Sequence, residues 1–127
     1  MARYSKQREA ILLVLQNTKS HPTAAWIYDR LREQLPNVSL GTVYRNLRKL
    51  TEEGAIISFT PDDGVERFDA DTSAHHHLKC ERCGCVVDLP FVPADAISER
   101  LEQMSDCKIT GSELMFYGIC GGCRAKV

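Results

Sequence analysis

The sequence predicts an α+β fold, in which a winged helix-turn-helix unit precedes a small α/β dimerisation unit with a structural zinc site. Three observations predict it. Apolar residues recur at helical spacing through residues 5–54, β-rich stretches flank a turn within residues 55–68, and two C-x-x-C pairs follow in the second half of the 127-residue chain. We expect a winged-helix domain at 1–69, a hinge at 70–74 and a metal-binding dimerisation domain at 75–127.

Two amphipathic helices are expected in the first 35 residues. The first begins at Ser5 and ends near Asn17, with its apolar residues at helical spacing. The second covers residues 24–35, because Thr23 is a good N-cap and Pro36 cannot continue a helix.

A third helix and a hairpin complete the first half. Ser39 is the expected N-cap of this helix, and Gly54 lies where a left-handed residue ends it. The β-rich residues 55–59 and 65–68 flank a turn at 61–64, which predicts the two-stranded wing. The buried stripe of the helix is expected to be Val43, Leu47 and Leu50.

The third helix occupies the place of the recognition helix, whose N-terminal residues reach base edges in the major groove. Its outward-facing side chains include hydroxyl, aromatic and basic groups, which suit phosphates, thymine methyl groups and guanine. An ordinary solvated helix is the alternative, and the basic first half of the chain favours DNA. The candidate DNA-binding residues are Ser39, Thr42, Tyr44, Arg45, Arg48 and Lys49.

Composition divides the chain into halves of opposite charge. Charged residues make up 26% and hydrophobic residues 43%, which is typical of a globular protein. Residues 1–60 hold nine Lys/Arg against five Asp/Glu, whereas residues 61–127 hold seven against twelve. The basic half is the one expected to bind a polyanion. No apolar run approaches the roughly 18 residues of a membrane span and no signal-peptide core follows Met1, so we expect a cytoplasmic protein without a membrane partner.

The second half is expected to contain strands at 77–80, 86–89 and 114–119 and an amphipathic helix at 94–104. A unit of about sixty residues buries only about 60% of its unfolded surface and is marginally stable by itself. A structural metal ion, a dimer interface or both are therefore expected to stabilise it.

Four cysteines form two C-x-x-C pairs separated by 36 intervening residues. Each such turn directs two sulfurs inward, and two turns make the tetrahedral four-thiolate cage that Zn²⁺ prefers. The separation indicates that the pairs follow different strands. A redox-active dithiol and disulfide bonds are the alternatives, and disulfides are disfavoured in a cytosolic protein. The predicted structural zinc ligands are Cys80, Cys83, Cys120 and Cys123.

Cys85 and Cys107 are left over. We expect buried small residues or spare thiols at both positions, and Cys85 could also replace a neighbour as a zinc ligand.

Three of the four histidines are consecutive, and acidic residues lie on either side of them. On a strand His75 and His77 point the same way, so they can share one ion, whereas His76 points to the opposite face. Asp69 ends the expected wing and Asp88 lies on the next strand. From the residues alone, the fourth histidine, His21, is interpreted as a residue that precedes a helix cap and not as a metal ligand.

Five segments together resemble the ferric-uptake-regulator family over nearly the whole chain, and the peroxide-stress repressors most of all. They are His21-Pro22-Thr23-Ala24, Gly41-Thr42-Val43-Tyr44-Arg45-Asn46-Leu47, Arg67-Phe68-Asp69, His75-His76-His77 with Cys80-x-x-Cys83-Gly84, and Tyr117-Gly118-x-Cys120-x-x-Cys123. Relatives usually carry a further helix ahead of the region that starts at Arg3 here, so the resemblance implies either that part of the usual DNA contact surface is missing or that the sequence is shortened at this end.

The resemblance implies a regulatory metal site of three histidines and two aspartates. Aspartate at position 88 is typical of the peroxide subgroup, because iron-uptake repressors usually carry glutamate there. Nitrogen and oxygen donors without thiolate suit Fe²⁺ or Mn²⁺. Reduced iron and peroxide would produce an oxidant beside the imidazole carbons, and the oxidation-sensitive positions implied are His21 and His75. The implied ligands are His21, Asp69, His75, His77 and Asp88.

The expected function is that of a non-enzymatic, homodimeric transcriptional repressor that binds a palindromic operator with Fe²⁺ or Mn²⁺ and releases it when peroxide oxidises the site. An iron- or zinc-uptake repressor of the same family is the nearest alternative. A thiol oxidoreductase that uses a C-x-x-C pair and a zinc-ribbon interaction module without a DNA role are the alternatives from other classes.

Overall fold

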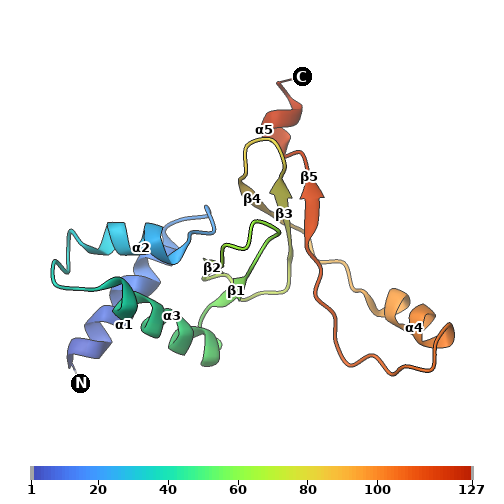
Figure 1. The fold of residues 1–127 in the computed structure, drawn as a ribbon, viewed down its shortest axis with the longest axis horizontal. Helices are drawn as coiled ribbons and strands as arrows, with labels where there is room; N and C mark the ends of the chain where they lie inside the picture. Colours follow the sequence, from blue (N-terminus) through green and yellow to red (C-terminus); the bar gives the residue numbers. More distant parts are fainter. Residues whose placement is uncertain (1, 127) are drawn as a thin grey trace. The chain divides into compact units, whose positions relative to one another are not determined.

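The computed structural model describes residues 2–126, with side chains from residue 6 onward. The chain divides into two compact units, the first ending at Ser73 and the second beginning at Ala74. The ribbon of each unit can be followed in Figure 1. Among the described residues, no helix has the length and apolar character needed to cross a membrane.

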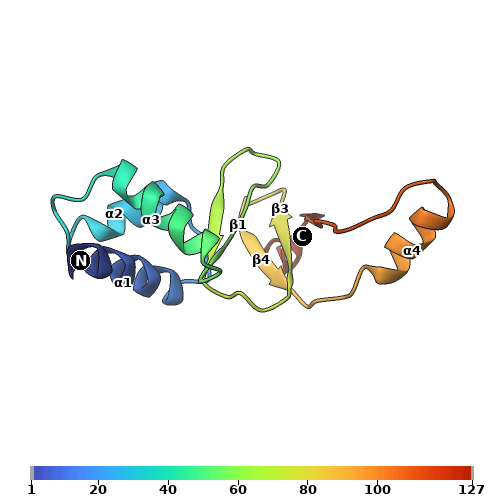
Figure 2. The same ribbon diagram turned by 90° about the horizontal axis from the view of Figure 1, so that it is seen from below.

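Three helices form the body of the first unit, as the sequence predicts: α1 (Ala2–Gln16), α2 (Ala24–Leu31) and α3 (Leu40–Glu52). All three pack against one another, and Figure 2 shows them from a second direction. The core between them is aliphatic, and each helix contributes to it. It includes Ile11, Leu15, Ile27, Leu31, Val43, Leu47 and Leu50.

Local capping interactions set where α2 and α3 begin. The backbone N–H of Trp26 donates to Thr23 Oγ1 at 3.2 Å, and the N–H of Thr42 donates to Ser39 Oγ at 3.1 Å. Both caps agree with the sequence analysis. The predicted ends were less accurate, because α1 begins at Ala2 rather than Ser5.

The expected second helix was too long, since α2 ends at Leu31 and not at residue 35. The carbonyl of Leu31 accepts from the N–H groups of both Gln34 and Leu35, at 3.0 and 2.8 Å. This tightened last turn satisfies the end of the helix before Pro36 stops the chain from continuing it.

The wing is the antiparallel pair β1 (Ile57–Phe59) and β2 (Arg67–Asp69), in which Ile57 lies opposite Asp69. Gly54, just after α3, has φ +78°, the left-handed conformation expected at the end of a helix. Phe68 is buried in the core of the unit. The first unit is therefore a three-helix body with a short wing.

The second unit contains a three-stranded sheet in the order β4-β3-β5. The strands are β3 (His76–Cys80), β4 (Val86–Leu89) and β5 (Phe116–Gly118). β3 pairs antiparallel with β4 and parallel with β5, so that Cys80 lies opposite Gly118. Six residues were expected in the last strand, and only three form it.

Two helices belong to the second unit. α4 (Asp95–Gln103) agrees with the predicted helix to within one residue at each end and has no buried residue. Figures 1 and 2 both show it extending away from the sheet. The short helix α5 (Gly121–Arg124) was not predicted, because its glycines are poor helix formers.

Candidate functional site

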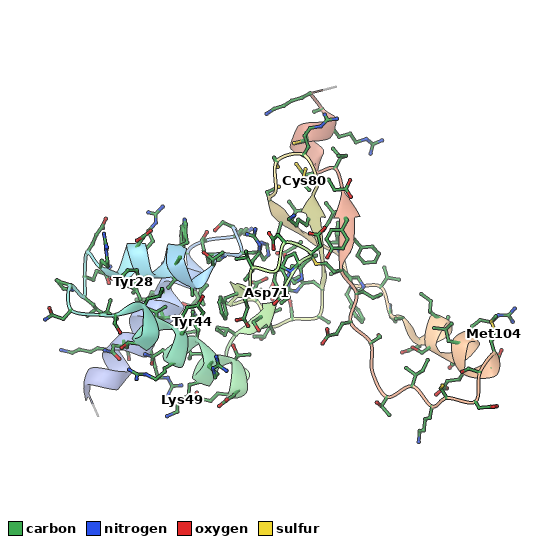
Figure 3. All side chains as sticks on the ribbon, in the orientation of Figure 1. Tyr28, Tyr44, Lys49, Asp71, Cys80 and Met104 are labelled. Atoms are coloured by element: carbon green, nitrogen blue, oxygen red, sulfur yellow. The ribbon has the colours of Figure 1, made fainter. Side chains whose placement is uncertain are left out.

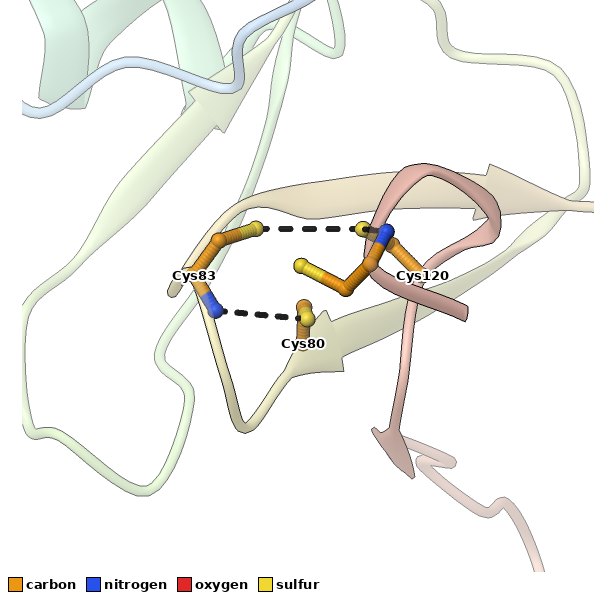
Figure 4. A group of neighbouring side chains, drawn as sticks. Cys80, Cys83 and Cys120 are labelled. Atoms are coloured by element: carbon orange, nitrogen blue, oxygen red, sulfur yellow. Dashed lines mark hydrogen bonds between the residues drawn. The ribbon is translucent and has the colours of Figure 1, made fainter. Parts of the chain in front are cut away.

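Four thiols meet where β3 ends and α5 begins. Parallel pairing of β3 with β5 brings the Cys80–Cys83 turn beside the Cys120–Cys123 turn, and all four Sγ atoms lie within 4.8 Å of one another. In each turn the N–H of the second cysteine donates to the Sγ of the first, at 3.4 Å. Figure 4 shows this bond between Cys83 and Cys80. The arrangement fits a tetrahedral four-thiolate metal site, as the spacing predicts.

Backbone hydrogen bonds prepare two of these thiols for metal binding. N–H groups of Cys120 and Cys83 lower the pKa of Cys80 to about 5, and the N–H of Cys123 lowers the pKa of Cys120. Burial raises the pKa of Cys123 to about 12. These hydrogen bonds favour the thiolate forms of Cys80 and Cys120, and a bound dication would displace the protons of the other thiols.

The two leftover cysteines are both exposed free thiols, so the expectation of buried residues was wrong and the alternative of spare thiols remains. Cys107 follows α4. Cys85 lies next to the thiol cluster, with its Sγ 3.2 Å from that of Cys83.

His21 and Asp69 lie together in the first unit. His21 is 3% exposed, its Nε2 lies 3.2 Å from Asp69 Oδ2, and its ring meets the ring of Phe59 edge-on. Its φ of +54° makes it the one described non-glycine residue with a left-handed backbone. Such a conformation is uncommon for histidine and persists where surrounding contacts hold it.

Contacts from β2 fix this conformation. Arg67 Nη1 donates to the His21 carbonyl at 3.4 Å, and the Phe68 N–H donates to the Pro22 carbonyl at 3.0 Å. The wing therefore supports the backbone around His21 and also supplies Asp69. Sequence reasoning from the residues alone missed the importance of His21. Its backbone conformation depends on contacts with β2, which lies more than forty positions later in the chain.

Three further donors converge in the second unit. His77 lies directly opposite Asp88 in the β3–β4 pair, and its Nε2 is 3.5 Å from Asp88 Oδ1. The Nε2 of His75 is 3.2 Å from the same oxygen and 3.0 Å from the Nε2 of His77. His76 lies on the other face and stacks on Phe91, with ring centroids 5.3 Å apart, as strand alternation predicts.

The structure therefore places two of the five predicted regulatory donors together in the first unit and three in the second. Each set combines imidazole nitrogen with carboxylate oxygen and contains no thiol. This donor chemistry fits Fe²⁺ or Mn²⁺, whereas the four-thiol cluster fits Zn²⁺.

The outer face of α3 is polar and basic. Tyr44, Arg45, Arg48 and Lys49 are exposed, and Figure 3 labels Tyr44 and Lys49 on this helix. The Thr42 hydroxyl lies 2.9 Å from Ser39 Oγ and accepts from Arg45 Nη2 at 3.1 Å. The predicted DNA-contacting side chains thus lie along the exposed side of the helix, from its N-cap Ser39 to Lys49 in its last turn.

A winged helix-turn-helix is a DNA-binding module, and here it shares a chain with two kinds of metal donor set, which defines a metal-dependent regulator. The model of the ferric uptake regulator family matches residues 1–117, and the chain belongs to this family. The resemblance inferred from the sequence segments is confirmed, as is the α+β fold class.

Proteins named as peroxide-responsive repressors are similar in sequence to almost the full length of this chain. The peroxide-responsive repressor PerR of Staphylococcus epidermidis is 36% identical over 124 residues, which cover 98% of this chain and 83% of that protein. The PerR of Staphylococcus aureus is 37% identical, with 98% and 84% covered. The crystal structure of the Campylobacter jejuni peroxide stress regulator superposes with a TM-score of 0.75 at 27% identity, covering 96% of this chain and 92% of that one.

Proposed function

We propose that this chain is a cytoplasmic, non-enzymatic transcriptional repressor that binds a palindromic operator as a homodimer in a metal-dependent manner. Oxidation of ligand histidines by peroxide releases the operator. The relatives named PerR support this assignment. So does Asp88, the residue implied by the resemblance to the peroxide subgroup.

One observation carries the proposal: each unit contributes an incomplete set of donors to the regulatory site. The first unit supplies His21 and Asp69, and the second supplies His75, His77 and Asp88. One cation bound by all five would join the winged-helix domain, residues 1–69, to the dimerisation domain, residues 75–127, across a hinge at 70–74. In support, the boundary between the compact units, after Ser73, falls within this hinge.

The joined state is the one that binds DNA, because in a dimer the angle between domains sets the spacing of the two recognition helices. To change the population from 1:99 to 99:1, the cation must favour the joined state about 10⁴-fold, or ~5.5 kcal/mol. Five ligands can supply this preference, and losing one or two of them to oxidation can remove it.

We assign Zn²⁺ to Cys80, Cys83, Cys120 and Cys123, and Fe²⁺ or Mn²⁺ to the regulatory donors. Fe²⁺ held by these donors would supply the electron that converts peroxide into an oxidant of imidazole, and Mn²⁺ would supply it poorly. His21 and His75 are the positions we expect to gain oxygen, one in each unit. Each is held close to a carboxylate, Asp69 and Asp88 respectively, which orients the ring and keeps it in place.

The proposed DNA interface is the exposed side of α3 with its N-cap. Arg48 and Lys49 suit phosphate, and Tyr44 and Arg45 suit base edges. Ser39 and Thr42 lie at the N-terminal end, where a recognition helix meets the groove.

The proposed homodimer uses the uncovered apolar face of the second unit. Ile97 and Leu101 of α4 and its C-cap residue Met104 are 59%, 50% and 71% exposed. A helix that leaves this much apolar surface in water is stabilised when a second copy covers it.

The peroxide step can be tested by exposing iron-loaded protein, prepared without oxygen, to a slight excess of hydrogen peroxide. We expect one added oxygen on the tryptic peptide 20–30, which contains His21, or on peptide 68–79, which contains His75. DNA binding, measured by fluorescence anisotropy, should be lost in parallel. The manganese-loaded protein is the control and should keep both its mass and its affinity.

His76 is a matched control for His75, because it lies in the same tryptic peptide, 68–79, but points to the opposite face of β3. His76→Ala should leave peroxide sensitivity unchanged, whereas His21→Ala should abolish metal-dependent DNA binding. Unchanged DNA binding after peroxide treatment of the iron form would reject peroxide sensing and favour a repressor that responds to metal supply.

A further inference from the structure

Five cysteine thiols, not four, gather at the proposed zinc site. Cys85 is the additional one, and its Sγ lies 3.2 Å from the Sγ of Cys83. Cys83 in turn lies 3.8 Å from Cys120, across the cluster. The regulatory function proposed above makes no use of Cys85.

Cys83 differs from the other three predicted zinc ligands in its exposure. Cys80, Cys120 and Cys123 are buried, whereas Cys83 and Cys85 are both exposed. A small oxidant in solution therefore reaches Cys83 before the rest of the cluster. It also finds a second thiol in contact with it.

The backbone between the two cysteines allows this contact. Gly84 has φ +80°, a left-handed conformation that side-chain-bearing residues rarely adopt. The chain turns sharply there, and the N–H of Gly84 donates to the Cys80 carbonyl at 2.9 Å. The two sulfurs thus lie on the same side of the turn, and a sulfur–sulfur bond of about 2.05 Å requires only a small movement of the side chains.

We propose that Cys83 and Cys85 form a thiol switch, in which peroxide converts the pair to a disulfide and opens the four-thiol cluster. Its effect on zinc rests on the zinc assignment made above. The switch needs no iron and does not involve the histidine site, so it would let the protein respond to peroxide when manganese occupies that site.

The reaction balances with hydrogen peroxide as the oxidant. The Cys83 thiolate attacks one peroxide oxygen, so that a sulfur–oxygen bond forms, the oxygen–oxygen bond breaks and hydroxide leaves. The sulfur of Cys85 then attacks the oxidised sulfur of Cys83, and the hydroxyl group leaves as water with the thiol proton. Two electrons pass from the sulfurs to peroxide, and one disulfide is formed.

Loss of Cys83 leaves three thiolates where a closed zinc site needs four. Cys80, Cys120 and Cys123 are themselves the buried cluster of this unit, so the change reaches its core. Zinc release and loosening of the sheet are the expected consequences.

Trypsin separates the cysteines in a way that makes the test direct. Cleavage after Lys79, Arg82, Arg100 and Lys108 places Cys83 and Cys85 together in peptide 83–100, with no other cysteine. Cys120 and Cys123 share peptide 109–124, and Cys107 lies in peptide 101–108.

The experiment treats manganese-loaded full-length protein with hydrogen peroxide, blocks remaining thiols with iodoacetamide and maps the peptides by mass spectrometry. A chromogenic chelator follows zinc release in the same sample. We expect peptide 83–100 to become two hydrogens lighter and unalkylated while one equivalent of zinc is released. Reducing agent and added zinc should reverse both changes.

Cys85→Ser is the test variant, with Cys85→Ala as a second choice, and Cys107→Ser is the control because it removes the other exposed non-ligand thiol. The Cys85 variants should release zinc more slowly than the wild type and the control, without a disulfide in peptide 83–100. Oxidation that joins Cys120 to Cys123 instead, a Cys85→Ser variant that behaves like the wild type, or a cluster that stays reduced would each overturn the proposal. None of these readouts depends on DNA or iron, so failure here is separate from failure of histidine-based sensing.

Discussion

Different interactions stabilise the interior of each of the two units. Among the described side chains of the first unit, ten apolar ones form a buried core, drawn from all three helices and from the wing. The corresponding cluster in the second unit consists of Cys80, Cys120 and Cys123, packed against Val87. Removal of apolar surface from water stabilises the first unit. The second has little such surface to remove and depends on what its thiols bind.

This difference explains why the proposed zinc ion and the proposed dimer partner would stabilise the second unit rather than the first. A small domain that lacks a sufficient apolar core usually needs a metal, disulfides or a partner to fold stably. The apolar side chains of α4 remain exposed, while three thiols, those of Cys80, Cys120 and Cys123, occupy the interior. The first unit can present a rigid recognition helix because its own core fixes α3.

The largest expected effect is a loss of stability that is confined to the second unit. Zinc chelation, or Cys120→Ser, should remove a contribution on the order of 10 kcal/mol from the second unit, since metal binding there is coupled to folding. Amide hydrogen exchange should show lost protection in β3 and β4 and unchanged protection in α1–α3. Retained protection in the zinc-free sheet would show that the sheet is stable by itself.

Truncating a buried side chain in the core of the first unit should instead destabilise that unit and leave the second unchanged. Leu47 is fully buried, so Leu47→Ala should lower the free energy of unfolding of this unit by about 2–5 kcal/mol, as in other large-to-small core substitutions. Zinc content should stay at one equivalent. Leu13→Ala is the control, because Leu13 is 56% exposed and its loss should cost less than about 0.5 kcal/mol.

Charging the exposed face of α4 should dissociate the dimer. Burying a leucine contributes about 1.5–3 kcal/mol, so Leu101→Glu should raise the dimer dissociation constant at least about tenfold. Analytical ultracentrifugation measures it. Glu99→Lys, two positions away and on the opposite side of the helix, should leave the dimer intact; equal effects of the two variants would argue against this interface.

The smallest effect concerns a single cap. Ser39→Ala removes the acceptor for the Thr42 N–H and should destabilise the first unit by about 1 kcal/mol. Ser39→Asn keeps a cap and should restore most of the loss in thermal unfolding. If both variants are equally unstable, then capping is not the main role of the Ser39 hydroxyl.

Local rules predicted much of the fold. Thr23 and Ser39 cap their helices as expected, and Gly54 adopts the left-handed conformation expected after α3. The strand alternation of His75, His76 and His77 was also read correctly. Each of these features depends on residues within a few positions of one another.

Features that depend on competing local hydrogen bonds, or on contacts between distant residues, were missed. The early end of α2 at Leu31 and the extra turn of α5 are decided by a few competing hydrogen bonds. The left-handed backbone of His21 depends on contacts with Arg67 and Phe68, which sequence spacing does not reveal. The exposure of Cys85 and its contact with Cys83 depend on how the turn folds around the cluster.

The β3–β4 hairpin fixes the spacing between the two donor sets of the second unit, the thiols and the His75/His77/Asp88 group. Cys80 ends β3, and His77 stands three residues before it, or about 10 Å along the strand. A shift of one residue in the pairing would turn Asp88 to the opposite face and away from His77. An ion that fixes the thiol turn between the two strands would therefore also hold His77 and Asp88 in register at the other end of the hairpin.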